Sequence, residues 1–184
     1  MKLAMACLVL SGLPWAAGAQ DKVNQGSLVL QDFGQRVAAY VKLQRAAASR
    51  IPGLKPTKTA AEIESHERAL AHELREGREG TMQGNIFTPE ITAQFRLLIG
   101  ETMKGPSAAR IRESLKQAEP VWLGKLQVNM SYPHGVPLQS SPPTLLMNLP
   151  ELPKQLEYRV VGRSLILRDL EANLIVDFIR DAIQ

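Results

Sequence analysis

Three histidines, His66, His72 and His134, are the side chains best suited to acid–base or metal chemistry in this sequence. His66 and His72 are six residues apart, so on one helix they point about 120° away from each other and cannot ligate the same ion. Glu62 and His66 have the spacing that lets two side chains share a metal, but this spacing also gives an ordinary helix-stabilising pair. We therefore predict no metal site and no cofactor.

The segment from Ser131 to Gly135 contains Tyr132 and His134 at the point where a predicted strand ends. Loops at strand ends often carry function, and a histidine there can act as a proton donor or acceptor. The alternative is a turn in which the His134 ring packs on Pro133. The sequence contains no phosphate-binding glycine loop, nucleophile elbow or His-Glu-x-x-His helix. We take Tyr132 and His134 as candidate binding residues and name no catalytic residue.

The first 19 residues have the order of parts that a cleavable secretion signal needs. Lys2 is followed by an apolar run from Leu3 to Leu13, and Ala17 and Ala19 provide small residues before a cut at Gln20. The run is shorter than the ~20 residues that span a bilayer as a helix. We expect residues 1–19 to be a signal peptide, the mature protein to be periplasmic or secreted, and no transmembrane segment to remain after cleavage.

Cysteine and charge narrow the class of protein. Cys7 is the single cysteine and leaves with the signal, so the mature chain forms no disulfide and has no thiolate ligand. This suits a bacterial periplasm better than a eukaryotic secretory route. The formal charge is +4, and residues 20–58 carry an excess of bases over Asp21 and Asp32. These bases can contact anionic lipid, envelope polymer or nucleic acid, but they are scattered, which is typical of a solvated helix face and a linker. We predict no nucleic-acid binding.

Residues 20–119 form a helical region with about four predicted helices. The first, from Ser27 to about Ser49, places Leu30, Phe33, Val37, Tyr40, Val41 and Ala48 on one face. A linker with two prolines follows. The other three helices begin behind the cap signals at Thr59, Thr88 and Ser107. We expect the first helix to pack on the others, although it can instead act as an interaction arm.

Residues 120–184 are predicted to form an antiparallel β region. Apolar and polar residues alternate from Trp122 to Tyr132, which predicts a strand with Val128 facing the core and Asn129 facing outward. A proline-rich segment, 133–153, packs on the body. Three further strands follow, at 156–161, 164–168 and 174–179, joined by short turns. The fold class is therefore α+β: about four helices followed by a small antiparallel sheet of about four strands.

The C-terminal part carries a resemblance. The residues are Leu149–Pro153, then Glu157–Asp169, then Leu174–Ile179. They resemble the proline-rich stretch and hairpin that end a group of uncharacterised exported bacterial proteins. More distantly, about 30 residues are similar to the small C-terminal sheet of periplasmic nickel/cobalt-homeostasis proteins. The resemblance implies a compact sheet in the cell envelope and brings no functional residue with it. The long helical part and the lack of a histidine-rich tract depart from the nickel/cobalt pattern.

These observations favour a non-enzymatic envelope protein that binds a ligand or partner, with the N-terminal helix as a candidate contact surface. Two alternatives remain open. One is a metal-homeostasis accessory protein, and the other is a hydrolase that uses the His134 loop.

The secreted form should begin at Gln20 or within two residues of it, because Ala17 and Ala19 occupy the −3 and −1 positions. The intact mass of the exported protein measures this directly. A mature mass that still includes residues 1–19 would contradict the signal peptide and restore a membrane anchor.

Overall fold

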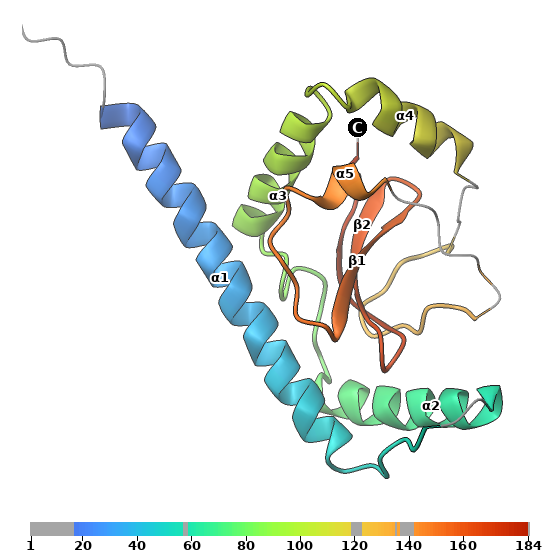
Figure 1. The fold of residues 1–184 in the computed structure, drawn as a ribbon. Coiled ribbons are helices and arrows are strands. Elements are labelled where there is room, and N and C mark those ends of the chain that lie inside the picture. Colours follow the sequence, from blue (N-terminus) through green and yellow to red (C-terminus); the bar gives the residue numbers. More distant parts are fainter. Residues whose placement is uncertain (1–16, 57–58, 119–122, 135, 137–141, 184) are drawn as a thin grey trace, which may run out of the picture.

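The structure is a computed structural model that describes residues 17–56, 59–118, 123–134, 136 and 142–183, with side chains from Gln25 onward. It is an α+β fold of helices followed by an antiparallel sheet (Figure 1). The helices are α1 (Ala17–Ala48), α2 (Ala60–Gly77), α3 (Pro89–Thr102), α4 (Ala108–Gln117) and the single turn α5 (Pro143–Leu146). The strands are β1 (Leu156–Val161), β2 (Ser164–Asp169) and β3 (Leu174–Ile179). The predicted class is thus confirmed, with three strands among the described residues where about four were expected.

Three of the helices begin at the predicted cap residues, and a side-chain cap hydrogen bond forms at Thr88 but not at Thr59 or Ser107. Thr59, Thr88 and Ser107 are the N-cap residues of α2, α3 and α4. At α3 the Thr88 side chain accepts a hydrogen bond from the backbone N–H of Ile91, and Pro89 takes the first helical position, where its missing N–H is not needed. Helix α1 differs from expectation because it begins ten residues before Ser27 and runs across the predicted cleavage point. No helix in the described part of the chain is both long and apolar enough to cross a membrane.

The sheet is an antiparallel meander in the order β1-β2-β3. The turn between β1 and β2 places Gly162 at φ 57°, a left-handed conformation that glycine adopts without a Cβ penalty. The turn between β2 and β3 ends at Asn173, also left-handed at φ 51°. The β2–β3 register shifts between Leu167 and Arg168. These turn signals are why the predicted positions of all three strands agree closely with the structure.

The predicted strand from Trp122 to Tyr132 is wrong. Trp122 lies outside the described residues, and residues 123–132 form an irregular segment with one bridge, Ser131 to Leu174. The segment is attached by two backbone hydrogen bonds to Ile175 of β3 and by one to Asn173 just before it; one of them joins the Asn129 N–H to the Ile175 carbonyl at 2.9 Å. Asn129 itself is left-handed at φ 64°, which breaks the pleat. The alternation marks burial only at the ends of the segment, where Leu126 and Tyr132 are buried and Gln127 and Ser131 are exposed; Val128 and Asn129, predicted to face opposite ways, are both half-buried.

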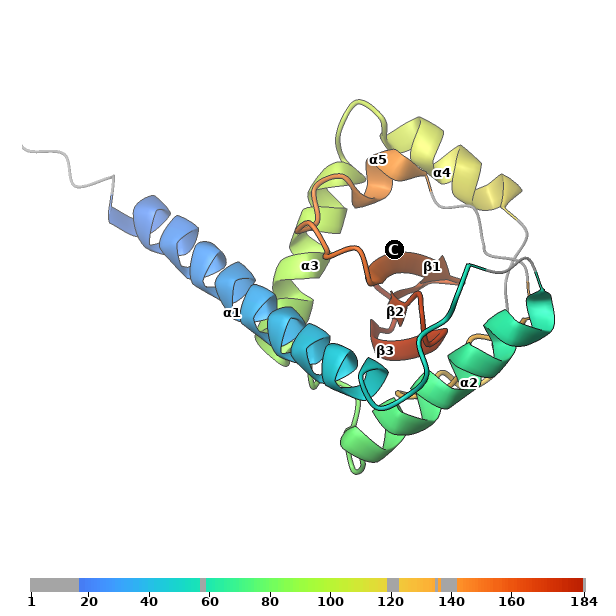
Figure 2. The same cartoon turned by 60° about the horizontal axis from the view of Figure 1, so that its bottom comes forward.

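The two faces of the sheet are covered differently. One face packs on α1, α3 and α5 through the largest core cluster, which includes Phe33, Phe95, Leu165 and Leu167. The other face packs on the irregular segment, where Leu126 and Tyr132 meet Val161, Ile166, Ile175 and Phe178. Helix α2 closes one end through a third cluster around Leu70 and Leu74. In Figure 2 the helices surround the sheet, and the first turns of α1 project beyond the body.

Helix α1 is held on the sheet by buried polar contacts as well as by its apolar face. The Tyr40 hydroxyl donates a 2.8 Å hydrogen bond to Asp169 Oδ2, and Asp169 Oδ1 accepts the backbone N–H groups of Glu171 and Ala172. One turn further along α1, Gln44 Nε2 donates to Glu171 Oε2 at 2.6 Å. The expectation that this helix packs on the body is therefore confirmed for its C-terminal half.

Replacing Tyr40 with Phe should lower the free energy of unfolding by about 1–3 kcal/mol, because it leaves a buried carboxylate oxygen without its donor. The measurement is urea denaturation. Tyr158→Phe is the matched control, since the Tyr158 hydroxyl donates a part-buried hydrogen bond to a neutral acceptor, the Pro150 carbonyl, at 3.1 Å, and its loss should cost about 0.5–1.5 kcal/mol. Equal losses would contradict a special role for the buried pair.

The stability of the protein should depend on pH through Asp169, whose pKa is raised above its ordinary value of 3.8 mainly by burial. Because the folded carboxyl holds its proton more tightly than the unfolded one, its stabilising effect is complete below the ordinary pKa and is lost as pH rises through the raised pKa. The difference in unfolding free energy between the wild type and Asp169→Asn should therefore shrink with increasing pH. Urea denaturation between about pH 3 and pH 7 measures it, and a difference that grows with pH would contradict the direction.

Candidate functional site

Tyr132, the first candidate binding residue, is buried in the body rather than presented on a surface loop. Only 3% of it is exposed. Its ring lies under the Arg168 guanidinium, 5.2 Å from the ring centroid. Its backbone N–H donates to the Asn173 carbonyl at 2.9 Å, and its carbonyl accepts from Asn173 Nδ2 at 3.0 Å. Burial raises the pKa of the Tyr132 hydroxyl. These contacts make Tyr132 part of the packing of the irregular segment on the sheet.

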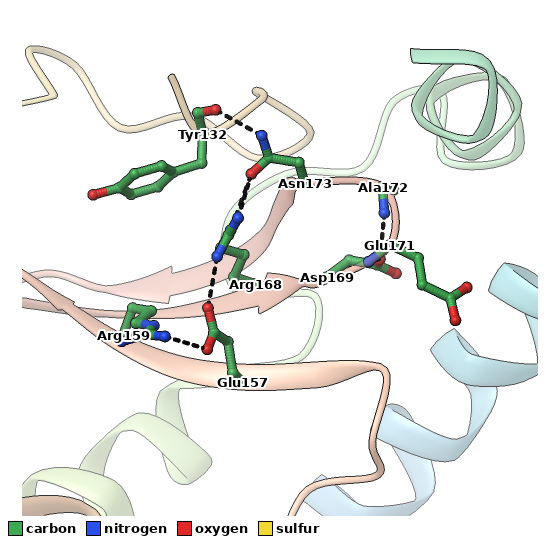
Figure 3. Close-up of polar contacts among 8 residues, drawn as sticks. All are labelled: Tyr132, Glu157, Arg159, Arg168, Asp169, Glu171, Ala172 and Asn173. Carbon is green, nitrogen blue, oxygen red and sulfur yellow. Dashed lines mark hydrogen bonds and ion pairs between the residues drawn. The ribbon is translucent and has the colours of Figure 1, made fainter. Parts of the chain in front are cut away.

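A polar cluster lies beside Tyr132 on that face of the sheet (Figure 3). Glu157 accepts from two arginines, with Arg159 at 2.7 Å from one carboxylate oxygen and Arg168 at 2.7 Å from the other. Arg168 also donates twice to Asn173 Oδ1, at 3.0 and 2.7 Å. Arg159 Nε is buried and has no hydrogen-bond partner within the part of the chain that is described. Arg168 and Asn173 thereby link Glu157 on β1 to the backbone of Tyr132 through hydrogen bonds.

His134, the second candidate, contacts a different element. Its Nε2 lies 3.3 Å from Glu67 Oε2 on α2, and its side chain is 56% exposed. Tyr132 packs on Arg168 while His134 reaches α2, so the structure gives the two residues different partners, although they are two positions apart in sequence. The pair of His134 with a carboxylate has the chemistry of a proton relay, and it also attaches the loop to α2.

The histidines of α2 form no metal site in the described residues. His72 pairs with Glu76 at 3.5 Å along the exposed face of the helix. Within the described ranges, no three side chains among His, Cys, Asp and Glu are grouped so that they could hold a metal ion.

Among the described residues, several grooves lie along α1, where sequence reasoning named only a candidate contact surface. The groove between α1 and residues 150–153, here called the proline groove, has a volume of about 490 Å³. Its α1 wall is a single helical stripe, and its opposite wall is Pro150, Glu151 and Pro153. The stripe consists of Leu30, Phe33, Gly34, Val37, Ala38, Val41, Lys42 and Arg45. A second groove of about 640 Å³, between α1 and α3, shares Leu30 with the first.

The floor and the wall of the proline groove are fixed by the core. The Phe33 ring packs on Phe95 at 4.9 Å and on Tyr158 at 6.5 Å between centroids. The Tyr158 hydroxyl donates a hydrogen bond to the Pro150 carbonyl at 3.1 Å. Tyr158 thus connects the aromatic floor to the proline wall, so both sides of the groove are set by packed residues.

Gly34 lies in the middle of the α1 stripe and opens the groove. A Cβ built on Gly34 would meet no atom within 4 Å. In a helix interior, glycine costs roughly 0.5–1 kcal/mol relative to alanine. Sequence reasoning missed this groove, and a glycine inside a strongly periodic helical pattern is the one signal that could have drawn attention to Gly34.

Lys42 and Arg45 give one end of the proline groove a positive charge. In the described residues, no carboxylate lies within 4.0 Å of either side chain, whereas other arginines such as Arg36 and Arg168 have carboxylate partners. Glu151, on the opposite wall, is the one acid among the lining residues. The lining therefore carries two cations and one anion above an apolar floor.

No family model matches the sequence, and no curated protein or solved structure matches it significantly. The resemblance to exported bacterial proteins and to nickel/cobalt-homeostasis proteins accordingly stays a hypothesis, and the proposals below rest on the grooves and contacts of this chain.

Proposed function

We propose that this is an exported, non-enzymatic protein of the cell envelope that binds a ligand or partner along α1. The observation that carries the proposal is the proline groove, an open and mostly apolar groove beside the helix, with Lys42 and Arg45 at one end, neither of which has a carboxylate partner among the described residues. Ligand sites are typically concave and mostly apolar, with a few placed polar groups, and their volumes are about 300–1,000 Å³. The proline groove has each of these properties.

Preorganisation also supports binding at this groove. Phe33, Val37 and Val41 line it while belonging to the main core cluster, so their positions are set by the fold before anything binds. The Tyr40–Asp169 hydrogen bond holds the same stretch of α1 to the sheet. A rigid groove orders few side chains when it is filled, which lowers the entropic cost of binding.

The His134–Glu67 contact supports one alternative, a hydrolase that uses the His134 loop. A histidine close to a carboxylate is a common arrangement for a general base, although the 3.3 Å contact here does not have hydrogen-bond geometry. The same pair also explains how a loop is attached to α2. His134→Ala should abolish turnover of an ester or amide substrate under the hydrolase hypothesis, and it should leave binding at the proline groove unchanged under ours.

Replacing Gly34 with Leu should abolish binding, because Gly34 lines the groove and there is open space for a Cβ at this position, so the added side chain should occupy volume that the ligand needs. The control is Gly100→Leu on α3, where an added Cβ also has no atom within 4 Å. The measurement is the melting temperature of the mature protein on addition of separated envelope lipids, soluble cell-wall fragments or envelope proteins.

At least one of these fractions should raise the melting temperature of the wild type and of Gly100→Leu, and should not raise that of Gly34→Leu. Both variants should be at least as stable as the wild type, because leucine favours a helix more than glycine does. If no fraction shifts the wild type, or if Gly34→Leu responds as the wild type does, the proposed function is wrong.

A further inference from the structure

We infer that the proline groove binds a single-chain anionic amphiphile, that is, one acyl chain with a negatively charged head, taken up as a free molecule. The inference rests on the proposed function and names the chemical class of its ligand. It is carried by how the groove lining is ordered along α1.

The lining changes from apolar to cationic along the helix. Leu30, Phe33 and Val37 line the first part of the groove, and Lys42 and Arg45 line the last. The stripe from Leu30 to Arg45 is about 22 Å long at 1.5 Å per residue. A ligand that matches it has an elongated apolar body and one anionic end. Glu151 faces the same groove, so the match depends on the excess of cations over this one acid.

The walls offer few hydrogen-bonding groups to a peptide. Pro150 and Pro153 have no backbone N–H. The Pro150 carbonyl already accepts from the Tyr158 hydroxyl, and the backbone of α1 is bonded within its helix. An extended peptide relies on main-chain hydrogen bonds for affinity, and the two prolines and the α1 backbone supply few of them. A chain of methylene groups needs no such partners and gains from apolar contact alone.

The proposed binding site for the head group is a pair of cations that have no carboxylate partner in the described structure. Lys42 and Arg45 have no carboxylate within 4.0 Å in the described ranges, while Arg50, the next base along the chain, pairs with Glu73. A carboxylate or phosphate at this end of the groove would supply the missing partner.

The test is binding of monomeric oleate to the mature wild-type protein, measured by displacement of a fluorescent C18 fatty acid, with oleyl alcohol as the neutral comparison. Oleate should bind saturably at one site and more tightly than oleyl alcohol. Gly34→Leu should weaken the binding of oleate and of oleyl alcohol at least about tenfold. Excluding two methylene groups of the ligand's chain from the groove is enough for that loss of affinity. Gly100→Leu should change neither.

A second variant tests the binding of the head group separately from the apolar floor of the groove. Lys42→Gln with Arg45→Gln removes two exposed charges without touching the core, so it should weaken oleate about threefold to tenfold and leave oleyl alcohol unchanged. Equal effects on the two ligands would overturn the assignment of the head group. Absence of saturable oleate binding, or binding that Gly34→Leu does not weaken, would overturn the inference.

The outcomes separate this inference from the proposed function. If an envelope protein or cell-wall fragment raises the melting temperature in a Gly34-dependent way and oleate does not bind, the protein is a binding module and the amphiphile is wrong. If the protein sediments with anionic phospholipid vesicles but does not bind monomeric oleate, the cations serve a membrane surface and the inference also fails.

Discussion

The fold depends on two aspartates that are buried at the sheet and satisfied mainly by backbone N–H groups. Asp177 on β3 is fully buried and accepts from the N–H groups of Gly84, Ile86 and Phe87, which wraps the loop before α3 around the strand. Asp169 does the same for the β2–β3 turn and adds the Tyr40 hydroxyl. A buried carboxylate is tolerated only when its oxygens are hydrogen-bonded. The positions of the α2–α3 loop and of α1 therefore follow from the need to satisfy two strand residues.

Arg78 connects these two regions from the end of α2. Its Nε donates to Asn129 Oδ1 at 2.7 Å and its Nη2 to the Val176 carbonyl at 2.8 Å, while the guanidinium lies 5.0 Å from the centroid of the Tyr40 ring. One buried cation thus contacts α1, β3 and the irregular segment together. This contact also explains why Asn129 is not the outward-facing residue that alternation predicts. A left-handed turn presents its amide to Arg78, and a turn of that kind suits asparagine.

Sequence rules that act within a few residues predicted the helices and most strands well. They predicted the proline groove poorly, because the groove depends on residues that are far apart in sequence. Helix caps and glycine or asparagine turns act within a few residues, so β1 and β3 agree with the sequence prediction at both ends. The segment before Tyr132 misled because a loop held on β3 by backbone hydrogen bonds can bury some apolar side chains, here Leu126 and Tyr132, as a strand does. The proline groove depends on residues 150–153 meeting α1 more than 100 positions away, which periodicity cannot report.

Gly34 connects the stability of α1 to the groove it lines. The fold does not require glycine there, because α1 is regular at that point and a Cβ would meet nothing within 4 Å. Alanine would satisfy the same backbone and would favour the helix by roughly 0.5–1 kcal/mol. A stabilising residue is therefore available at this position, yet it would begin to fill the channel between α1 and Pro150. Binding sites commonly retain residues that are suboptimal for stability, so under the proposed function Gly34 is the lining residue whose missing side chain leaves the groove wider.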